Sequence, residues 1–262
     1  MEILIPILTL GALGLIFGVS LAIASKQFAV KTDQRLEKIV GLLPGANCGA
    51  CGGAGCFGFA ERLLKGELSI DACRVSEEKT KEQLARILGK KIEQKVKLVA
   101  TLHCYGGRKV EDRFLYEGLE NCVAANLVLG GQKACVFGCL GFGDCEKVCP
   151  FGAIKISEEG LPVVDESKCR ACNKCVLICP KKLFSLRPLT HKIYVACSCH
   201  DLGRDTSAAC PVGCIACRKC EQICPVDAIH VIDNLAVIDY QKCTSCGKCV
   251  EACPRKTIRR SL

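Results

Sequence analysis

The chain has 262 residues, of which 25 are cysteines and none is tryptophan, and it carries 36 Lys and Arg against 27 Asp and Glu. Small modules with so few aromatic residues cannot bury a large apolar core, so another interaction has to hold them together. Cysteines in C-x2-C groups, Lys-rich linkers and the absence of a basic secretory n-region favour metal binding in a reducing compartment over a secreted disulfide scaffold. The formal net charge of +9 counts every cysteine as neutral, which metal-ligating thiolates are not, so it does not indicate nucleic-acid binding.

Residues 3–24 form an uncharged, largely apolar run. As a helix this run would extend about 33 Å, against about 30 Å for the core of a bilayer. Ala22-Ile23-Ala24 resembles a signal-peptide cleavage site, but the run is too long for a signal peptide and no basic residue precedes it. We therefore predict a transmembrane anchor over residues 1–25 and a tether over residues 26–43.

Four basic residues follow the apolar run: Lys26, Lys31, Arg35 and Lys38. Positive charge close to one end of a membrane helix favours the cytoplasmic side for that end. The sequence thus predicts a single-pass protein of the cell inner (cytoplasmic) membrane, with the rest of the chain on the cytoplasmic side.

Residues 44–80 contain a glycine-rich group of cysteines with C-x2-C-x4-C-x16-C spacing: Cys48, Cys51, Cys56 and Cys73. Four thiols at this spacing suit one [4Fe-4S] cluster, and the glycines let backbone N–H groups approach its sulfurs. A structural zinc site is the alternative. Residues 57–72 have helical spacing, and we expect Phe57, Ala60 and Leu64 to pack against the cluster.

The linker region, residues 81–130, combines a charged segment with an apolar one. Residues 76–97 have helical character, with Ser76 as the expected N-cap. Residues 97–104 (KLVATLHC) are typical of a buried strand.

Three perfect C-x2-C-x2-C-x3-C-P runs follow: Cys169, Cys172, Cys175 and Cys179; Cys214, Cys217, Cys220 and Cys224; Cys243, Cys246, Cys249 and Cys253. This spacing is the bacterial ferredoxin signature, in which three thiolates hold one [4Fe-4S] cluster and the fourth, before proline, ligates its neighbour. Paired runs within one chain predict that the protein carries electrons.

Residues 209–262 therefore form one two-cluster ferredoxin module. The crossing rule gives one cluster Cys214, Cys217, Cys220 and Cys253, and the other Cys243, Cys246, Cys249 and Cys224. Residues 131–190 are predicted to form a second module of the same kind, joined to residues 209–262 by a connector of residues 191–208. The two modules are sequence repeats, because Leu161–Asp165 precedes the run that begins at Cys169 just as Leu235–Asp239 precedes the run that begins at Cys243.

Each half-module is expected to contain a short strand, a cluster loop and a short helix. The predicted fold class is α+β: a transmembrane helix, a 4Fe-4S domain and two tandem ferredoxin modules. Strands this short do not form a stable sheet alone, so the clusters would act as the core and the apoprotein modules would be largely unfolded.

Three stretches together resemble the B subunit of Rnf-type ion-translocating ferredoxin:NAD+ oxidoreductase complexes: GLLPGANCGACGGAGC at residues 41–56, LHCYGG at residues 102–107, and residues 121–154. With the ferredoxin runs, the resemblance covers nearly the whole chain. It implies an electron-relay component that accepts electrons from soluble reduced ferredoxin and passes them to partner membrane subunits, whose coupled movement drives Na+ or H+ across the membrane.

The resemblance also implies a cluster where the opening run departs from the ferredoxin pattern. That run is Cys135-x3-Cys139-x5-Cys145-x3-Cys149-Pro150, and the family has the same expanded loop. The crossing rule then gives cluster one Cys135, Cys139, Cys145 and Cys179, and cluster two Cys169, Cys172, Cys175 and Cys149.

These assignments make five [4Fe-4S] clusters and leave five cysteines. A sixth cluster, held by Cys104, Cys122, Cys197 and Cys210 with Cys199 as a substitute for one of them, is a further hypothesis; the alternative is buried apolar thiols. His103, beside Cys104, could ligate or tune a cluster, or be an ordinary hydrogen-bonded histidine.

No residue pattern indicates a catalytic acid, base or nucleophile, a P-loop or a Rossmann unit, so we expect the chain to bind neither NAD nor flavin by itself. Two other functions remain open. One is a polyferredoxin subunit of a different membrane oxidoreductase, such as a hydrogenase or a complex-I-like assembly. The other is a zinc or iron–sulfur scaffold without electron-transfer function.

Overall fold

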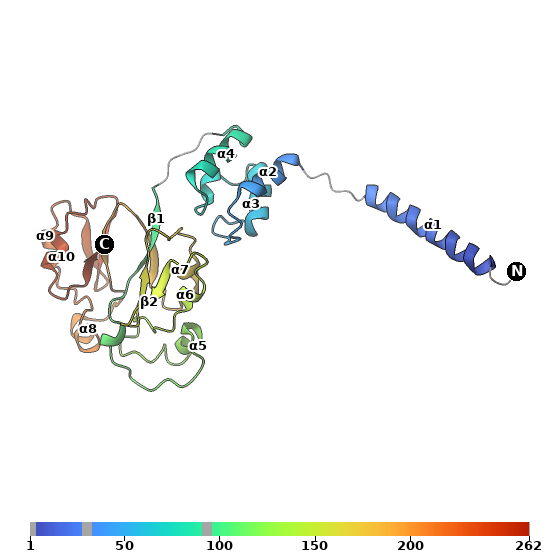
Figure 1. Ribbon diagram of the computed structural model, residues 1–262. Helices are drawn as coiled ribbons and strands as arrows, with labels where there is room; N and C mark the ends of the chain where they lie inside the picture. The colour runs from blue at the N-terminus through green and yellow to red at the C-terminus, as the bar shows by residue number, and fades with distance from the viewer. Residues whose placement is uncertain (1–3, 28–32, 91–95, 262) are drawn as a thin grey trace. The chain divides into compact units, whose positions relative to one another are not determined.

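The computed structural model describes residues 4–27, 33–90 and 96–261 (Figure 1). The chain divides into two units, Met1–Gly41 and Leu42–Leu262. Among the described residues, the fold consists of one long N-terminal helix, several short helices and four separate two-stranded antiparallel sheets. This mixed content agrees with the predicted α+β class.

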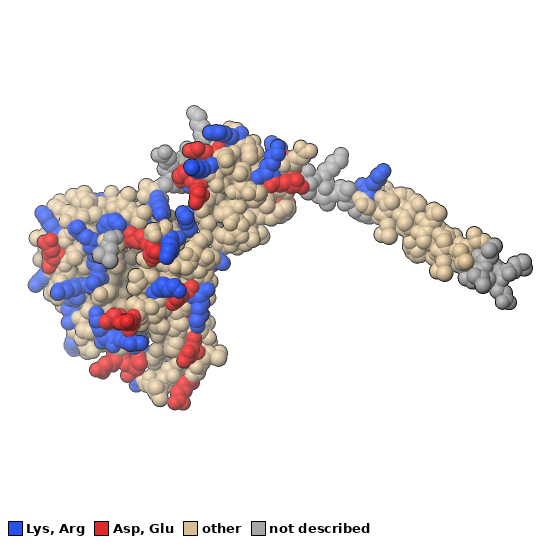
Figure 2. Space-filling view, in the orientation of Figure 1, with Lys and Arg blue, Asp and Glu red and all other residues tan. Residues whose placement is uncertain are grey.

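The first unit contains the predicted apolar helix. Helix α1 spans Leu4–Gln27, and its segment Ile7–Gln27 is long and apolar enough to cross a membrane. The side chains described along α1 are nearly all exposed, and only Lys26, near its C-terminal end, adds charge (Figure 2). The helix thus continues slightly beyond the predicted anchor. Helix α2, Gln34–Leu42, occupies half of the predicted tether.

The second unit begins with helix α3 (Gly55–Leu64), a 3-10 turn η1 (Ile70–Ala72) and helix α4 (Glu78–Leu88). The predicted packing face of α3 was wrong in detail. Phe57 is 54% exposed, whereas Phe59, Ala60 and Leu63 are buried. Phe59, Ala60 and Leu63 stand at positions i, i+1 and i+4 of the helix that starts at Gly55, and residues at these positions share one face of a helix.

The predicted N-cap of the next helix was also wrong. The cap position of α4 is Glu77, and no side chain caps it. The Ser76 hydroxyl lies 3.0 Å from the Cys73 Sγ and donates to it. The helix ends where Gly89 takes a left-handed conformation, with φ of 64°. Residues 91–95 of the predicted helical segment lie outside the described residues.

The first ferredoxin module is built on two sheets. Strand β1 (Leu98–Leu102) is the buried strand expected from the sequence, and it pairs with β4 (Phe184–Pro188), more than 80 residues further on. Strands β2 (Ile154–Ile156) and β3 (Pro162–Val164) form the second sheet. Its helical segments are η2 (Gly107–Lys109), α5 (Cys122–Leu127), α6 (Asp144–Lys147) and α7 (Lys174–Ile178).

The second module has the same plan. Strand β5 (Ile193–Val195) pairs with β8 (Ile258–Arg260), and β6 (Ile229–Ile232) pairs with β7 (Leu235–Ile238). Its helices are α8 (Gly203–Ala209), α9 (Lys219–Ile223) and α10 (Lys248–Ala252). In each module one sheet pairs a strand that precedes the cysteine runs with a strand that follows them: β1 with β4 in the first module and β5 with β8 in the second.

Cysteines form much of what these modules bury. The core of the first module includes Cys145, Cys169 and Cys175 beside the sheet residues Val99 and Ile154. In the second module, buried cysteines again lie among aliphatic strand residues. A core with so many thiols has few apolar side chains of its own, so what the thiols bind decides the stability of the module.

Candidate metal centres

The N-terminal group of cysteines surrounds one cavity, as the sequence predicted. Cys48, Cys51, Cys56 and Cys73 line it, with Phe59 of α3 as part of its wall. The Asn47 Oδ1 accepts the backbone N–H of Cys56 at 2.8 Å and so fixes the start of α3. A Cβ at Gly53 would come within 2.7 Å of the Phe59 nitrogen, so this close approach requires glycine.

Both predicted sets of the second module also converge. Cys214, Cys217, Cys220 and Cys253 line one cavity. Cys224, Cys243, Cys246 and Cys249 line another. In each set one cysteine comes from the other half of the module, as the crossing rule requires.

Backbone N–H groups point at several of these sulfurs. The amide of Thr257 donates to the Cys253 Sγ at 3.3 Å, and that of Ala228 donates to the Cys224 Sγ at the same distance. Such bonds favour a charged sulfur and, in an iron–sulfur site, adjust its reduction potential.

The backbone of the cluster loops follows one pattern. In three C-x2-C-x2-C loops the residues on either side of the middle cysteine have positive φ: Ala171 and Asn173, Ala216 and Arg218, Ser245 and Gly247. Left-handed non-glycine residues are strained and persist only where the surrounding structure holds them. The repeated strain indicates that all three loops are shaped for the same bound group.

One predicted set lies in the core of the first module, where Cys149 packs against the buried group that contains Cys169 and Cys175. Cys149, Cys169, Cys172 and Cys175 lie close enough for their sulfurs to interact, and burial, with Cys169, Cys172 and Cys149 adding to it, raises the pKa of Cys175 to about 12. The amide of Ala100 in β1 donates to the Cys169 Sγ at 3.4 Å. The strand preceding the module thus contributes directly to this site.

The other set of this module differs from the predicted one. Cys122, Cys139, Cys145 and Cys179 line a common cavity, and Cys135 is not among them. The Asp144 carboxylate explains the exchange, because its Oδ2 accepts the Cys122 amide at 2.8 Å and the Val123 amide at 3.3 Å. Asp144 precedes Cys145, so this contact holds the start of α5 beside the cluster loop.

Cys122, a member of the hypothetical sixth cluster in the sequence-based assignment, therefore lies with the first module. Its only sequence signal is its place directly after Asn121, whose Oδ1 caps α5 by accepting the Ala124 amide at 2.7 Å. Burial raises the pKa of Cys122. Neither feature distinguishes a ligand from a buried thiol.

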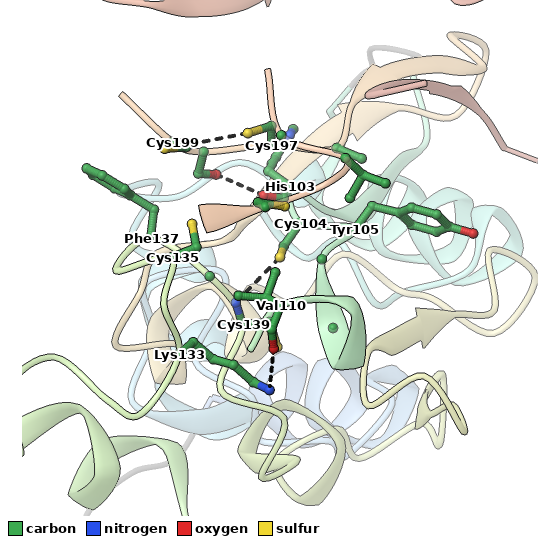
Figure 3. Close-up of a pocket in the computed structure, with 18 residues that line it drawn as sticks. His103, Cys104, Tyr105, Val110, Lys133, Cys135, Phe137, Cys139, Cys197 and Cys199 are labelled. Atoms are coloured by element: carbon green, nitrogen blue, oxygen red, sulfur yellow. Dashed lines mark hydrogen bonds between the residues drawn. The ribbon is translucent and has the colours of Figure 1, made fainter. Parts of the chain in front are cut away.

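Five cysteines remain, and they line one further cavity, which Cys139 also lines: Cys104, Cys135, Cys197, Cys199 and Cys210 (Figure 3). Neighbouring His103 is not positioned as a ligand. Its Nδ1 lies 2.7 Å from the Val195 carbonyl and its Nε2 lies 2.6 Å from the Ser185 hydroxyl. Burial lowers its pKa. His103 is thus an ordinary hydrogen-bonded histidine, the second of the two roles that the sequence allowed.

The fit to a cluster can be judged from the cavities. In the described part of the chain, no three His, Cys, Asp or Glu side chains converge closely enough to hold a single metal ion. The thiols instead surround spaces of about 320–410 Å³ not filled by protein atoms. Four thiols and inward-pointing N–H groups around such a space fit a [4Fe-4S] cluster, which supplies one-electron transfer when bound.

Comparison with family models agrees with this geometry. Residues 43–75 match a family of Fe-S cluster domains, residues 213–257 match a 4Fe-4S dicluster domain, and residues 162–183 and 135–153 each match a 4Fe-4S binding domain. The last match begins at Cys135, so the family model places Cys135, Cys139 and Cys145 in one motif. In the fold, by contrast, Cys135 does not line the cavity that Cys139 and Cys145 share.

Known relatives cover most of the chain. It is 44% identical over 242 residues to the B subunit of the Na+-translocating ferredoxin:NAD+ oxidoreductase complex of Acetobacterium woodii, covering 92% of this chain and 73% of the relative. It is 40% identical over 253 residues to the B subunit of the ion-translocating oxidoreductase complex of Methanosarcina acetivorans, covering 96% of each. Its identity to the proton-translocating counterpart of Clostridium ljungdahlii is also 40%, over 88% of this chain and 82% of the relative. The chain therefore belongs to the family of B subunits of ion-translocating, Rnf-type oxidoreductase complexes.

Proposed function

We propose that this chain is the electron relay of a membrane-bound, ion-translocating ferredoxin:NAD+ oxidoreductase. It accepts electrons from soluble reduced ferredoxin and passes them through [4Fe-4S] clusters to partner subunits. The observation that carries the proposal is that cysteines distant in sequence gather in sets of four, in an N-terminal domain and two ferredoxin modules.

Five sets of ligands are part of this proposal, and the cysteine-lined cavities support them. They are Cys48, Cys51, Cys56 and Cys73; Cys122, Cys139, Cys145 and Cys179; Cys149, Cys169, Cys172 and Cys175; Cys214, Cys217, Cys220 and Cys253; and Cys224, Cys243, Cys246 and Cys249. The first module then comprises β1 and residues 131–190 together with α5, and the second comprises residues 191–262.

The work of the protein in this relay is positioning. Its cysteines fix where the electrons reside. Backbone donors such as the Thr257 and Ala228 amides adjust the potentials by bonding to sulfur. No side chain has to move a proton, because only electrons pass along this chain.

Helix α1 supports membrane anchoring, as does membership in a family of membrane complexes. We propose that α1 crosses the inner membrane once and that the iron–sulfur domains lie on its cytoplasmic side. Lys26 in the last turn of α1 is consistent with that orientation.

The experiment is EPR spectroscopy on the full chain purified without oxygen, titrated with dithionite and with reduced ferredoxin. We expect [4Fe-4S] signals that appear with both reductants. A pale protein lacking acid-labile sulfide, or one that contains zinc instead of iron, would contradict the proposal.

Replacing Cys217 by Ser tests one ligand within the relay. We expect the loss of one cluster, about four iron atoms, and slower oxidation of ferredoxin. The matched control is Cys197→Ala, which removes a thiol outside all five sets and should leave the iron content unchanged. Unchanged iron and activity in Cys217→Ser would refute this ligand assignment.

A further inference from the structure

Five thiols outside the five sets come together from four separate segments. Cys104 follows β1, Cys135 precedes the expanded loop, Cys197 and Cys199 follow β5, and Cys210 follows α8. Figure 3 shows the labelled members of this group around one pocket. The space not filled by protein atoms there is about 410 Å³, at least as large as the about 320–390 Å³ in the four cysteine-lined cavities described above. The space beside these thiols is therefore comparable with that beside the other cysteine sets.

Four of the five thiols that line this pocket interact in pairs. Cys135 interacts with Cys199 and with Cys104. Cys210 completes the group, because its sulfur interacts with both Cys104 and Cys199. Each of the four thus interacts with two others, and all four line the same pocket.

Cys197 is placed differently. Its Sγ accepts the backbone N–H groups of Cys199 and Cys214, each at 3.4 Å. It therefore lies toward Cys214 of the second module, whereas the Cys199 sulfur lies toward Cys135. Two of the four ligands in our sequence-based hypothesis, Cys122 and Cys197, are replaced by Cys135 and Cys199.

We propose that Cys104, Cys135, Cys199 and Cys210 hold a sixth [4Fe-4S] cluster at the junction of the two ferredoxin modules, and that this site carries electrons between them. The second part rests on the relay function proposed above. Cys104 and Cys135 come from the first module, and Cys199 and Cys210 come from the second, so neither module can form the site alone.

The surroundings suit a negatively charged group. The Cys139 amide donates to the Cys104 Sγ at 3.4 Å, and the Thr206 hydroxyl lies 3.3 Å from the Cys199 Sγ. The Arg255 guanidinium donates to the Cys210 carbonyl at 2.6 Å, which keeps a positive charge beside that cysteine. An oxidised cluster with four thiolates carries about −2 net charge, which these donors offset.

The site contacts a ligand of the first module directly, through Cys104, and Cys197 beside the site contacts a ligand of the second. Cys139, whose amide bonds to Cys104, belongs to the first module, and Cys214, whose amide bonds to Cys197, belongs to the second. One electron arrives from a reduced cluster of one module and leaves to an oxidised cluster of the other. No bond is made or broken and no further reactant is consumed.

The test is iron and acid-labile sulfide analysis of the full chain purified anaerobically. The wild-type protein should contain about 24 iron atoms, and the Cys104→Ala/Cys135→Ala double variant about 20, because removal of two ligands leaves no stable partial cluster. Cys197→Ala, the matched control, should keep about 24. A wild-type content of about 20, or a double variant with unchanged iron, would overturn the sixth site.

A second pair of variants guards against misfolding of the first module. Cys199→Ala/Cys210→Ala removes the ligands that come from the second module and should cost the same iron. The site is supported if either double variant loses only about four iron atoms and keeps the other EPR signals. If both variants also lose iron from other sets, the iron content of the wild-type protein, with Cys197→Ala as its control, decides whether the sixth site exists.

Electron transfer separates this inference from the relay function itself. Ferredoxin should reduce the clusters of both modules in the wild-type protein but of only one in either double variant. A protein with about 20 iron atoms that ferredoxin still reduces fully would keep the relay and remove the sixth site. A protein with about 24 iron atoms that ferredoxin does not reduce would keep the sixth site and contradict the relay function.

Discussion

The two ferredoxin modules have the same architecture but recruit their cysteines differently. In the second module, where both loops keep the C-x2-C-x2-C spacing, the four cysteines of each set that the crossing rule predicts line one cavity. In the first module, with its expanded loop, Cys122 of α5 lines the cavity of Cys139 and Cys145, whereas Cys135 lines the cavity at the junction. A linear motif thus fixes its ligands only while the loop keeps its length; beyond that, contacts from distant segments decide.

The largest expected effect is loss of fold in both modules when iron is removed. Their sheets have only two strands of three to five residues, and thiols make up much of what is buried. Without a bound group, the remaining apolar contacts are too few to hold either module. Anaerobic chelation of iron, followed by limited proteolysis, should show cleavage throughout residues 96–261. Protease resistance in a protein free of iron and sulfide would show that the modules have independent cores.

The next effect separates the two ligand sets that the expanded loop rearranges. We expect Cys122→Ala to cost one cluster, and Cys122→Ala combined with Cys145→Ala to cost no more, because both residues serve the same site. Cys122→Ala combined with Cys104→Ala should cost two. Iron analysis and EPR on the three variants measure this.

The sequence-based assignment predicts the opposite pattern. There Cys122 and Cys104 share a site, so their losses would not add, whereas those of Cys122 and Cys145 would. Asp144→Ala serves as an independent check, since it removes the carboxylate that holds the start of α5 without removing a thiol.

Most of the regular part of the molecule could be predicted from the sequence. The apolar helix, the four-cysteine N-terminal group and both sets of the second module follow from spacing alone. The pairing of β1 with β4 could not be predicted, because strands of five residues carry no register information across so long a separation. Cys122 was missed for a related reason, since its place depends on Asp144, and an aspartate before a cysteine has no distinctive sequence signature.

A smaller effect concerns a charge that only the first module buries. Arg187 in β4 is 2% exposed, and its guanidinium bonds to the Glu166 carboxylate and to the His191 carbonyl. In the second module the outer strand β8 instead carries Arg259, half-buried, and Arg260, exposed. Removing one member of a buried ion pair leaves the other uncompensated and costs about 3–5 kcal/mol.

We expect Arg187→Met to be near the lower limit, about 3 kcal/mol, because Glu166 keeps Lys192 at 3.2 Å. Arg260→Met is the matched control in the second module and should change the free energy of unfolding by less than about 0.5 kcal/mol. Anaerobic urea unfolding of the holoprotein measures both. Equal midpoints for the two variants would mean that the buried pair contributes nothing.

The smallest effect is a difference in pH response at matching positions. In the first module the Lys155 Nζ lies 3.0 Å from the Glu146 Oε1, and the glutamate follows Cys145. In the second module the His230 Nδ1 lies 3.2 Å from the Glu221 Oε1, and that glutamate follows Cys220. The same helix-to-strand contact thus has a permanent cation in one module and a titratable one in the other.

The hydrogen bond that His230 donates to the Glu221 carboxylate, together with the charge of Asp227 at 3.6 Å, raises the pKa of His230. A raised pKa in the folded state stabilises the fold below the unfolded value of about 6.5, and that stabilisation is lost as pH rises through the folded pKa. The hydrogen bond with Lys155 lowers the pKa of Glu146, so the Lys155–Glu146 ion pair keeps both charges at neutral pH and is lost only in acid. Raising the pH from about 6 to about 8.5 should therefore weaken the second module alone.

Hydrogen exchange of the β6–β7 amides, compared with that of the β2–β3 amides, measures this difference in pH response, and His230→Lys should abolish the difference. Equal loss of protection in both hairpins, or a pH response that survives in His230→Lys, would show that the titrating group lies elsewhere.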